Sequence, residues 1–505
     1  MTGGYLGEGG RLTGGPAPEL VASGYAQEIA HAPRLARAMG EADLAHAVAL
    51  ADCGALDTAV AAALIGGLRE LEAIPADDFP WNPARGDAFN SREAELTRRV
   101  GPAAAGWLSA GRPRREAFRV ALRQVARDGA VDLHDALVEL AEALLVHAAV
   151  TAQDLAADYT YLQPAQPTTV GHLLLAYLRP ALRDAARLRE VHGELCRSVA
   201  GVGGSAGSRW PIDRTRLAAL LGCDGLVEHA KDAAWQVDVY VQLVAAVATS
   251  CMHGSHIGQD LEILASQEFG MVQLADQHSR ASALMPQKRN PYALAVVRTM
   301  AGTAAGELAG LLVTLHTGSA RTDHFHALNG MVPRLMAEAH AVAHLLARVV
   351  AGMHVDSARM GDAARRGFTQ AADVADVVAQ DCGLDYRTAH HVVGRAVRMV
   401  VDAGGEPGDL TPDLLERAGA DAGGHAVRIS PERLAEALDP LACALGRPQV
   451  GSSGPEAMRA MIAHAGADIA EARVWSREAR RRREAGAHLL AASADALVSR
   501  GSTST

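Results

Sequence analysis

Long stretches of the chain repeat apolar residues three and four positions apart, which is the spacing of one helix face. The clearest of these runs cover about 115–200, 229–266 and 291–316. An earlier stretch, from about 18 to 75, predicts helices broken at Gly54 and at Ile74-Pro75. We therefore expect an all-α fold built around a bundle of long helices.

Three polar loops containing Gly or Pro interrupt the periodic segments. They cover residues 109–117, 158–169 and 279–291. Functional side chains concentrate on loops that a rigid scaffold positions. We therefore expect the chemistry of this protein in these three segments.

The pattern divides the chain into four expected parts. They are an N-terminal helical domain (1–117), a central helical-bundle domain carrying the third loop (118–364), a small helical domain (365–475), and a basic helix with a polar tail (476–505). We find no internal repeat of fixed period.

Composition agrees with helices and excludes several classes of protein. Hydrophobic residues make up 49% and aromatic residues 4%, with many Ala-rich stretches, a balance that favours helices over sheets. The net charge of −10 provides no global basic field for nucleic acid or an anionic membrane. We also expect neither a secretion signal nor a membrane-spanning helix, because no run approaches about 18 apolar residues.

The cysteines and histidines do not indicate a metal site or a disulfide framework. Six cysteines are scattered without ligand spacing, which fits a reducing cytoplasm. His253 and His256 are three residues apart but have no third ligand at a suitable spacing, so we expect helix-surface or core histidines there. The run Arg480–Arg483 is most simply a solvated helix face or a subunit contact. We expect no metal and no cofactor.

The third loop places a hydroxyl (Ser282), an amine (Lys288) and an amide (Asn290) close together. Elimination of an amine β to a carboxylate needs a base for a carbon-bound proton, and cationic and hydrogen-bonding groups for the dianionic aci-carboxylate that results. Lys288 and Asn290 suit the second task. Ser282 suits the first if Lys288, backbone donors and a helix N-terminus overcome its weak acidity. The alternative is an ordinary turn broken by Pro286 and Pro291.

This loop closely follows the GSSxMPxKxNP signature of the fumarase/aspartase superfamily, in the MPQKxNP form typical of argininosuccinate lyases. Further stretches that resemble lyase motifs are GRPRR (111–115), DYTYLQPAQP (158–167), PIDR (211–214), SQEFG (266–270) and AHHVVG (389–394). The resemblance covers roughly residues 11–475. It implies a three-domain fold and a homotetramer with a core of twenty helices, in which loops of three subunits form each active site.

The resemblance also implies roles for individual residues. Ser282 would be the proton-abstracting base, and Lys288 and Asn290 would stabilise the aci-carboxylate. The expected contacts with a small dicarboxylate substrate are Arg114, Thr160, Gln163 and Met285.

The chain departs from the family pattern at Tyr161 and at Arg115, where Glu116-Ala117 also replaces an Asp-Gln pair. Tyr161, a further catalytic candidate, stands where the family motif has the histidine usually credited with assisting proton transfer. A tyrosine, with a pKa of about 10, can donate a hydrogen bond but is a poor proton shuttle near neutrality. Arg115 replaces an asparagine beside the expected carboxylate pocket. It would meet a further anionic group on the substrate, or pair with Glu116.

A third departure concerns the segment 320–331. In argininosuccinate lyases the matching segment holds the guanidinium end of the substrate, and here its tyrosine, glutamine and lysine are missing. His324 or His326 would supply a general acid, or would serve a structural or solvent-exposed role.

These observations leave three functions open. The first is a carbon–nitrogen lyase that releases fumarate from an N-substituted aspartate or a nitrogen-bearing succinate, such as nitrosuccinate, hydrazinosuccinate or an aminocarboxylate adduct. The second is a genuine argininosuccinate lyase. The third is a catalytically silent structural homologue.

Overall fold

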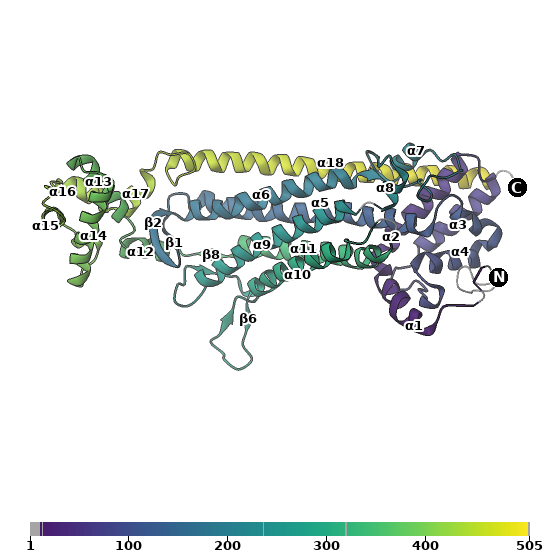
Figure 1. Cartoon of the computed structure of the whole chain (residues 1–505), viewed down its shortest axis with the longest axis horizontal. Coiled ribbons are helices and arrows are strands. Elements are labelled where there is room, and N and C mark those ends of the chain that lie inside the picture. Colours follow the sequence, from purple (N-terminus) through teal and green to yellow (C-terminus); the bar gives the residue numbers. More distant parts are fainter. Residues whose placement is uncertain (1–10, 13, 236, 319–320, 503–505) are drawn as a thin grey trace.

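Helices dominate the computed structural model, which describes residues 11–12, 14–235, 237–318 and 321–502. Long helices form the central bundle (Figure 1). They are α5 (Arg114–Val150), α6 (Val170–Leu195), α9 (Asp238–Leu264), α10 (Tyr292–Thr314) and α11 (Asp323–Gly352). α5 packs against α6 and α11, and α10 packs along α9. The expected all-α fold is confirmed.

α10 leaves much of its apolar surface open. Leu312 is 53% and Val313 is 69% exposed. By length and composition, α10 and α11 would be long enough to cross a membrane, with a mean hydropathy of 1.2, although we expected no such segment. The core helix of a soluble protein passes the same test, so this finding is weak support for a membrane span.

The N-terminal helices pack at one end of the bundle. They are α1 (Pro18–Leu20), the π-helical turn η1 (Val21–Tyr25), α2 (Ala26–Asp52), α3 (Thr58–Glu72) and α4 (Ala88–Ala105), with short 3-10 turns η2 (Pro83–Arg85) and η3 (Gly106–Ser109). The fully buried carboxylate of Asp43 contacts Arg92 at 2.9 Å and Arg112 at 2.5 Å. Because a buried charge needs such partners, this cluster fixes the segment that leads into α5.

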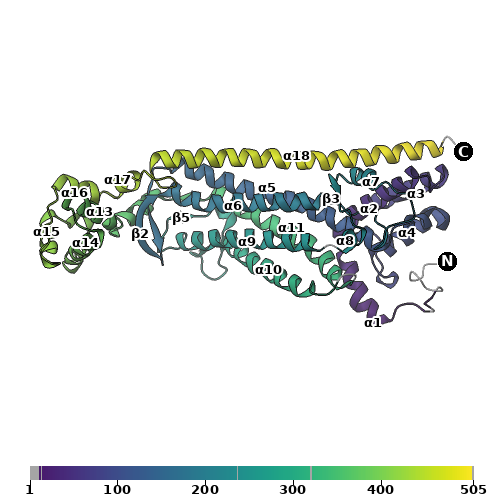
Figure 2. The ribbon, with the colours of Figure 1, turned by 45° about the horizontal axis from the view of Figure 1, so that its top comes forward.

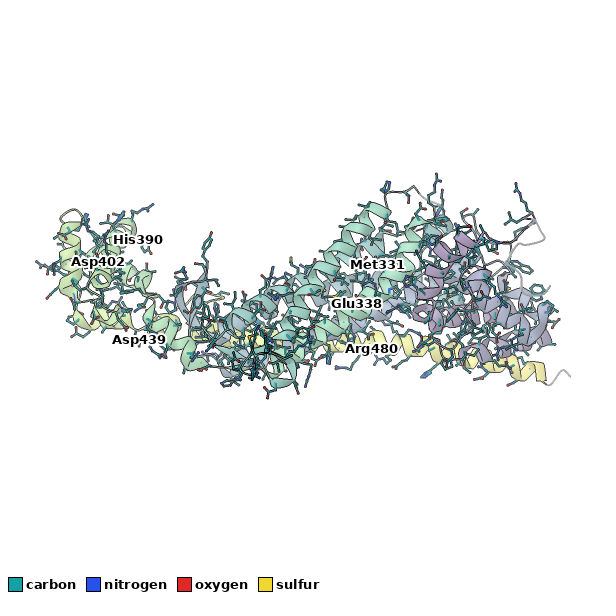
Figure 3. The ribbon with its side chains drawn as sticks, turned by 90° about the horizontal axis from the view of Figure 1, so that it is seen from below. Met331, Glu338, His390, Asp402, Asp439 and Arg480 are labelled. Carbon is teal, nitrogen blue, oxygen red and sulfur yellow. The ribbon has the colours of Figure 1, made fainter. Side chains whose placement is uncertain are left out.

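A small helical unit at the other end has a hydrophobic core of its own. It follows α12 (Ser357–Arg366). Its helices are α13 (Ala371–Cys382), α14 (Tyr386–Asp402), η5 (Pro407–Asp409), α15 (Pro412–Asp421), α16 (Pro431–Leu438) and α17 (Pro440–Leu445). Asp385, Thr411 and Ser430 cap the first turns of α14, α15 and α16. Figure 3 places His390 and Asp402 in this unit, far from Met331 in the bundle.

The last helix, α18 (Pro455–Ser502), runs back along the whole bundle to the N-terminal helices (Figure 2). It packs against α2, α3, α5, α6 and the short α7 (Arg214–Leu220). The boundary that we expected at 475/476 lies inside this helix. Neither glycine in its second half interrupts it, and the basic residues 480–483 form part of its surface.

Strands occur only as two-stranded pairs in the described residues. They are β1 (Leu155–Thr160) with β2 (Gln163–Thr169), β3 (Arg197–Ser198) with β4 (Gly225–Leu226), β5 (Val272–Gln273) with β8 (His354–Val355), and β6 (Arg280–Ala281) with β7 (Arg289–Asn290). Only the β3–β4 pair is parallel. The segment 158–169 that we expected as a polar loop is therefore mostly a hairpin. Its Tyr and Thr residues favour extended backbone.

Candidate active site

The signature loop is the connection of the β6–β7 hairpin, which projects from the bundle in Figure 1. The Ser282 Oγ accepts hydrogen bonds from the backbone amides of Leu284 (3.3 Å) and Met285 (3.0 Å). Such bonds stabilise an oxygen on which negative charge develops. The expected backbone donors for Ser282 are thus present.

The base of the same loop is closed by side chains. The Asn290 amide donates to the Arg280 carbonyl at 2.9 Å, and the Arg289 guanidinium pairs with Asp276 at 2.7 Å. Lys288 is exposed and makes no ion pair within the described part of the chain. The sequence placed Ser282, Lys288 and Asn290 together, and they lie on one short hairpin.

The β1–β2 hairpin carries the second group of expected site residues. Thr160 pairs with Gln163, which leaves Tyr161 and Leu162 as a two-residue turn. Both turn residues have positive φ (54° and 59°), and Tyr161 is 99% exposed. Turns of this kind favour Asn and Gly, so a Tyr-Leu pair is strained there. Strain at an exposed aromatic tip favours a functional role for the tip.

The third group lines a cavity of about 180 Å³ between η1, the start of α5 and the start of α11. Two ion pairs border it. Arg114 contacts Asp87 at 3.0 Å, and His326 contacts Glu28 at 3.0 Å. The hydrogen bond that the His326 ring donates to the Glu28 carboxylate raises the pKa of His326 from its usual value. Its contact with Glu28 therefore favours the protonated form of His326, which can donate a proton.

Arg115 does not pair with Glu116, so one of our two explanations for Arg115 is wrong. Glu116 is buried and its Oε1 accepts the backbone amide of Gly201 at 2.6 Å, while its Oε2 has no partner. Burial raises the pKa of Glu116 to about 7. The Arg115 guanidinium instead lies over the ring of Trp235, at 5.3 Å from the centroid. Arg115 makes no ion pair with any carboxylate among the described residues.

Our two candidate histidines have different environments. His324 is only 3% exposed, lies against Trp235 and Phe325, and has no hydrogen-bond partner for either ring nitrogen. Burial lowers its pKa, so His324 is neutral at pH 7. Of the two, only His326 lines the cavity.

Arg119 also lines this cavity, and sequence reasoning missed it. It is 4% exposed, its guanidinium lies over the rings of Trp235 and Phe325, and its Nη2 has no partner. The only available signal was its spacing. Arg119 lies four residues after Arg115, on the same face of a helix.

The three groups lie apart within one chain. In Figure 1, β2 lies toward the small helical unit, β6 marks the loop that projects from the bundle, and α1, next to the 180 Å³ cavity, lies toward the opposite end. A site that uses all three groups would need more than one copy of the chain.

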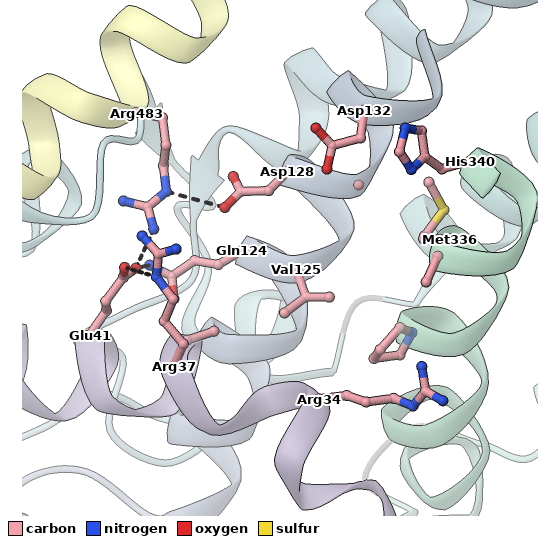
Figure 4. Close-up of a pocket in the computed structure, with 14 residues that line it drawn as sticks. Arg34, Arg37, Glu41, Gln124, Val125, Asp128, Asp132, Met336, His340 and Arg483 are labelled. Carbon is pink, nitrogen blue, oxygen red and sulfur yellow. Dashed lines mark hydrogen bonds and ion pairs between the residues drawn. The ribbon is translucent and has the colours of Figure 1, made fainter. Parts of the chain in front are cut away.

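A larger hollow between α2, α5, α11 and α18 has a volume of about 360 Å³ (Figure 4). Each carboxylate on its wall already has an arginine partner. These pairs are Glu41 with Arg37 (3.3 Å), Asp128 with Arg483 (3.2 Å) and Asp132 with Arg480 (2.9 Å). We therefore assign this hollow a structural role.

The two helical histidines of α9 are not arranged as metal ligands. His253 contacts the buried Asp184 at 2.7 Å, and the ring of His256 lies 6.3 Å from that of His253. Among the described residues no group of three or more His, Cys, Asp or Glu side chains is placed to hold a metal ion.

Comparison with known proteins identifies the family. The profile of a family described as lyase matches residues 13–306, and one described as argininosuccinate lyase C-terminal matches residues 368–444. An argininosuccinate lyase of Methanoculleus marisnigri is 32% identical over 450 residues, with 88% of this chain and 89% of that protein covered. One of Thiobacillus denitrificans is 34% identical over 412 residues, with 79% and 86% covered.

Solved structures agree with this result. A variant of EDDS lyase with bound fumarate matches with a TM-score of 0.88 and 26% identity, covering 97% of both chains. The 3-carboxy-cis,cis-muconate lactonizing enzyme from Pseudomonas putida matches with a TM-score of 0.71 and 24% identity, covering 87% of this chain and 95% of that one, which is a likeness of fold alone. The chain therefore belongs to the fumarase/aspartase superfamily, among its argininosuccinate lyase-like carbon–nitrogen lyases.

Proposed function

We propose that this lyase releases fumarate by β-elimination from an N-substituted aspartate or a nitrogen-bearing succinate other than argininosuccinate. The observation that carries the proposal is the pair of backbone amides that donate to the Ser282 Oγ, in the same hairpin as Lys288 and Asn290. This arrangement supports a serine that loses its proton and acts as a base.

Each part of the elimination has a candidate group. Ser282, as the alkoxide, removes a proton from the carbon next to one substrate carboxylate. Lys288 and Asn290 stabilise the aci-carboxylate that forms. The C–N bond then breaks, its electron pair stays on nitrogen, and the carbons form the double bond of fumarate. His326, whose protonated form the Glu28 carboxylate stabilises, is the acid that we propose for a basic leaving group.

The segment after α10 argues against arginine as the leaving group. The tyrosine, glutamine and lysine of the family motif are absent from 320–331; Ala320 itself lies outside the described residues. The candidate substrates remain nitrosuccinate, hydrazinosuccinate and aminocarboxylate adducts of fumarate. The EDDS lyase structure that holds fumarate supports fumarate as the shared product.

We further propose a homotetramer in which three chains contribute to each site: one the signature loop, one the β1–β2 tip and one the Arg114 cavity. Two observations support this proposal. The three groups lie apart in one chain, and α10 exposes apolar side chains such as Val313 that a second copy would bury.

The test is fumarate release, followed by ultraviolet absorbance, from argininosuccinate, aspartate, nitrosuccinate, hydrazinosuccinate and N-substituted aspartates. We expect release from a member other than argininosuccinate. Ser282→Ala should lower kcat by about 1,000-fold or more, because the base is lost. Light scattering should show the same particle mass for this variant.

Other outcomes identify the alternatives. Release from argininosuccinate alone would make this protein a genuine argininosuccinate lyase, as its relatives are named. If no compound in a panel widened to other succinates releases fumarate, a non-catalytic homologue is favoured. Full activity of Ser282→Ala would exclude Ser282 as the base.

A further inference from the structure

We propose that Arg115 and Arg119 form a subsite for a carboxylate on the leaving group, so that the substrate is an N-(carboxyalkyl)aspartate and the second product is an amino acid. This inference rests on the proposed function and specifies the substrate of the same site. Its basis is the set of unpaired groups around the 180 Å³ cavity.

The two arginines are held in place by aromatic rings, not by carboxylates. They lie one turn apart on α5, and both guanidinium groups lie near the ring of Trp235, at 5.3 Å and 5.7 Å. Phe325 also contacts Arg119. Aromatic faces orient a guanidinium without neutralising its charge, so both side chains keep donors for an anion.

The charges around the cavity leave an excess of two cations. The titratable groups that line it, from η1 to α11, are Tyr25, Glu28, Asp87, Arg114, Arg115, Arg119 and His326. With His326 protonated there are four cations and two carboxylates, a difference of two. Both carboxylates are already used, by Arg114 and His326. The excess therefore falls on Arg115 and Arg119.

Burial and the neighbouring cations lower the pKa of both arginines, to about 9 for Arg119. A lowered arginine pKa means that the surroundings within this chain stabilise the charged form poorly. A carboxylate bound between the two guanidinium groups would supply the missing charge in a bidentate geometry.

The cavity wall also offers an acceptor. The Asn329 Oδ1 is a buried acceptor without a donor, whereas the Arg119 Nη2 is a buried donor without an acceptor. A carboxylate for the arginines and an amine N–H for Asn329 together describe an amino acid. A water molecule occupies roughly 30 Å³ in the liquid, so the 180 Å³ cavity has the volume of about six water molecules. This volume suits a small amino acid better than a three-atom anion such as nitrite.

The test compares N-(carboxymethyl)aspartate with N-methylaspartate, which differ only in the carboxylate of the leaving group. We expect kcat/KM to be about 100-fold higher for the carboxylated substrate, the worth of a charged hydrogen-bonded contact. Arg119→Met should remove most of this preference, because it lowers kcat/KM for the carboxylated substrate, chiefly through KM, far more than for N-methylaspartate. Arg119→Lys should restore part of it.

Arg395→Met, which changes an exposed arginine in the small helical unit, is the matched control and should change nothing. Calorimetric titration of glycine into the Ser282→Ala protein, with and without Arg119→Met, measures the subsite without any turnover. Binding that depends on Arg119 supports the subsite.

Equal kcat/KM for both substrates, or glycine binding unaffected by Arg119→Met, would overturn the subsite while fumarate release still upheld the proposed function. Absence of fumarate from every substrate, with Arg119-dependent glycine binding retained, would overturn the proposed function and leave the subsite standing.

Discussion

Glu116 shows how a single buried carboxyl group links the site to the pH dependence of folding. Its Oε1 ties the first turn of α5 to Gly201, next to Arg114 and Arg115. Its pKa is raised from 4.5 to about 7, mainly by burial, so the folded protein binds this proton more tightly than the unfolded chain does. The resulting stability is fully present below pH 4.5 and is lost as the pH rises through 7.

Glu116→Gln should remove this pH dependence. A shift of this size corresponds to about 3 kcal/mol of unfolding free energy. We therefore expect the variant to be more stable than the native protein by about 1–3 kcal/mol at pH 8 and of similar stability at pH 5, since an amide cannot ionise and its oxygen can still accept the Gly201 amide. Denaturant titrations at both pH values measure this difference.

Glu190→Gln changes an exposed glutamate and serves as the control. It should shift the unfolding free energy equally, and only slightly, at the two pH values. If Glu116→Gln also behaves this way, Glu116 is ionised in the folded protein across the range.

At the residue scale, the sequence predicted site residues that are close together in the chain. It missed contacts between residues that only folding brings together. Ser282, Lys288 and Asn290 follow one another in a short loop, so their proximity required no knowledge of the fold. Arg119 gains its environment from Trp235 and Phe325, which are about 115 and 205 positions away, and no local pattern indicates such a contact. The supposed pairing of Arg115 with Glu116 failed because adjacent helix residues point in different directions.

At the scale of elements, α18 depends on close contact with the loop after α7. A Cβ on Gly486 would lie 2.5 Å from the Cα and the backbone N of Gly222, whereas a Cβ on Gly466 would meet nothing nearer than Leu145 at 4.0 Å. Both glycines lie within the same helix. They form a matched pair for testing how tightly the helix is docked.

Gly486→Ala should destabilise the protein by about 1–3 kcal/mol, because backbone atoms cannot yield as a side chain can. Gly466→Ala should stabilise it by about 0.5–1 kcal/mol through the higher helix propensity of alanine. Thermal unfolding of the two variants measures both effects. Equal behaviour of the pair would mean that α18 is loosely held at Gly222.

The elements themselves were predictable to different degrees. The long helices were expected because apolar residues recur with helical period over many turns. The β1–β2 hairpin was not expected, because Pro164 and Pro167 suggest a loop and the turn at Tyr161-Leu162 lacks the usual Asn or Gly. The return of α18 along the bundle was also not predicted, because the helices that pack against α18 decide which of its faces is buried.

At the scale of the whole molecule, the proposed shared site predicts complementation between inactive variants. Ser282→Ala damages the signature loop and Arg114→Met damages the cavity on α5. If different chains supply these two groups, about a quarter of the sites in an equal, randomly assembled mixture would contain neither change. Co-refolding the two variants should therefore restore about a quarter of native activity.

Each variant refolded alone is the control and should remain inactive. If the mixture is inactive although an affinity tag on one variant captures the other, both groups come from the same chain. The proposal of a shared site would then be wrong.

The path of α18 also has a consequence for synthesis. Arg69 on α3 donates to the carbonyl of Ala491, 422 residues further along the chain. At roughly 5–20 residues per second, a ribosome needs about 20–80 s to make the intervening segment. During that time the N-terminal helices lack the helix that covers them, and loop closure over so many residues is slow. Each helix forms from local contacts, but the N-terminal helices must wait for α18. Nascent chains of this enzyme should therefore depend on chaperones until synthesis is nearly complete.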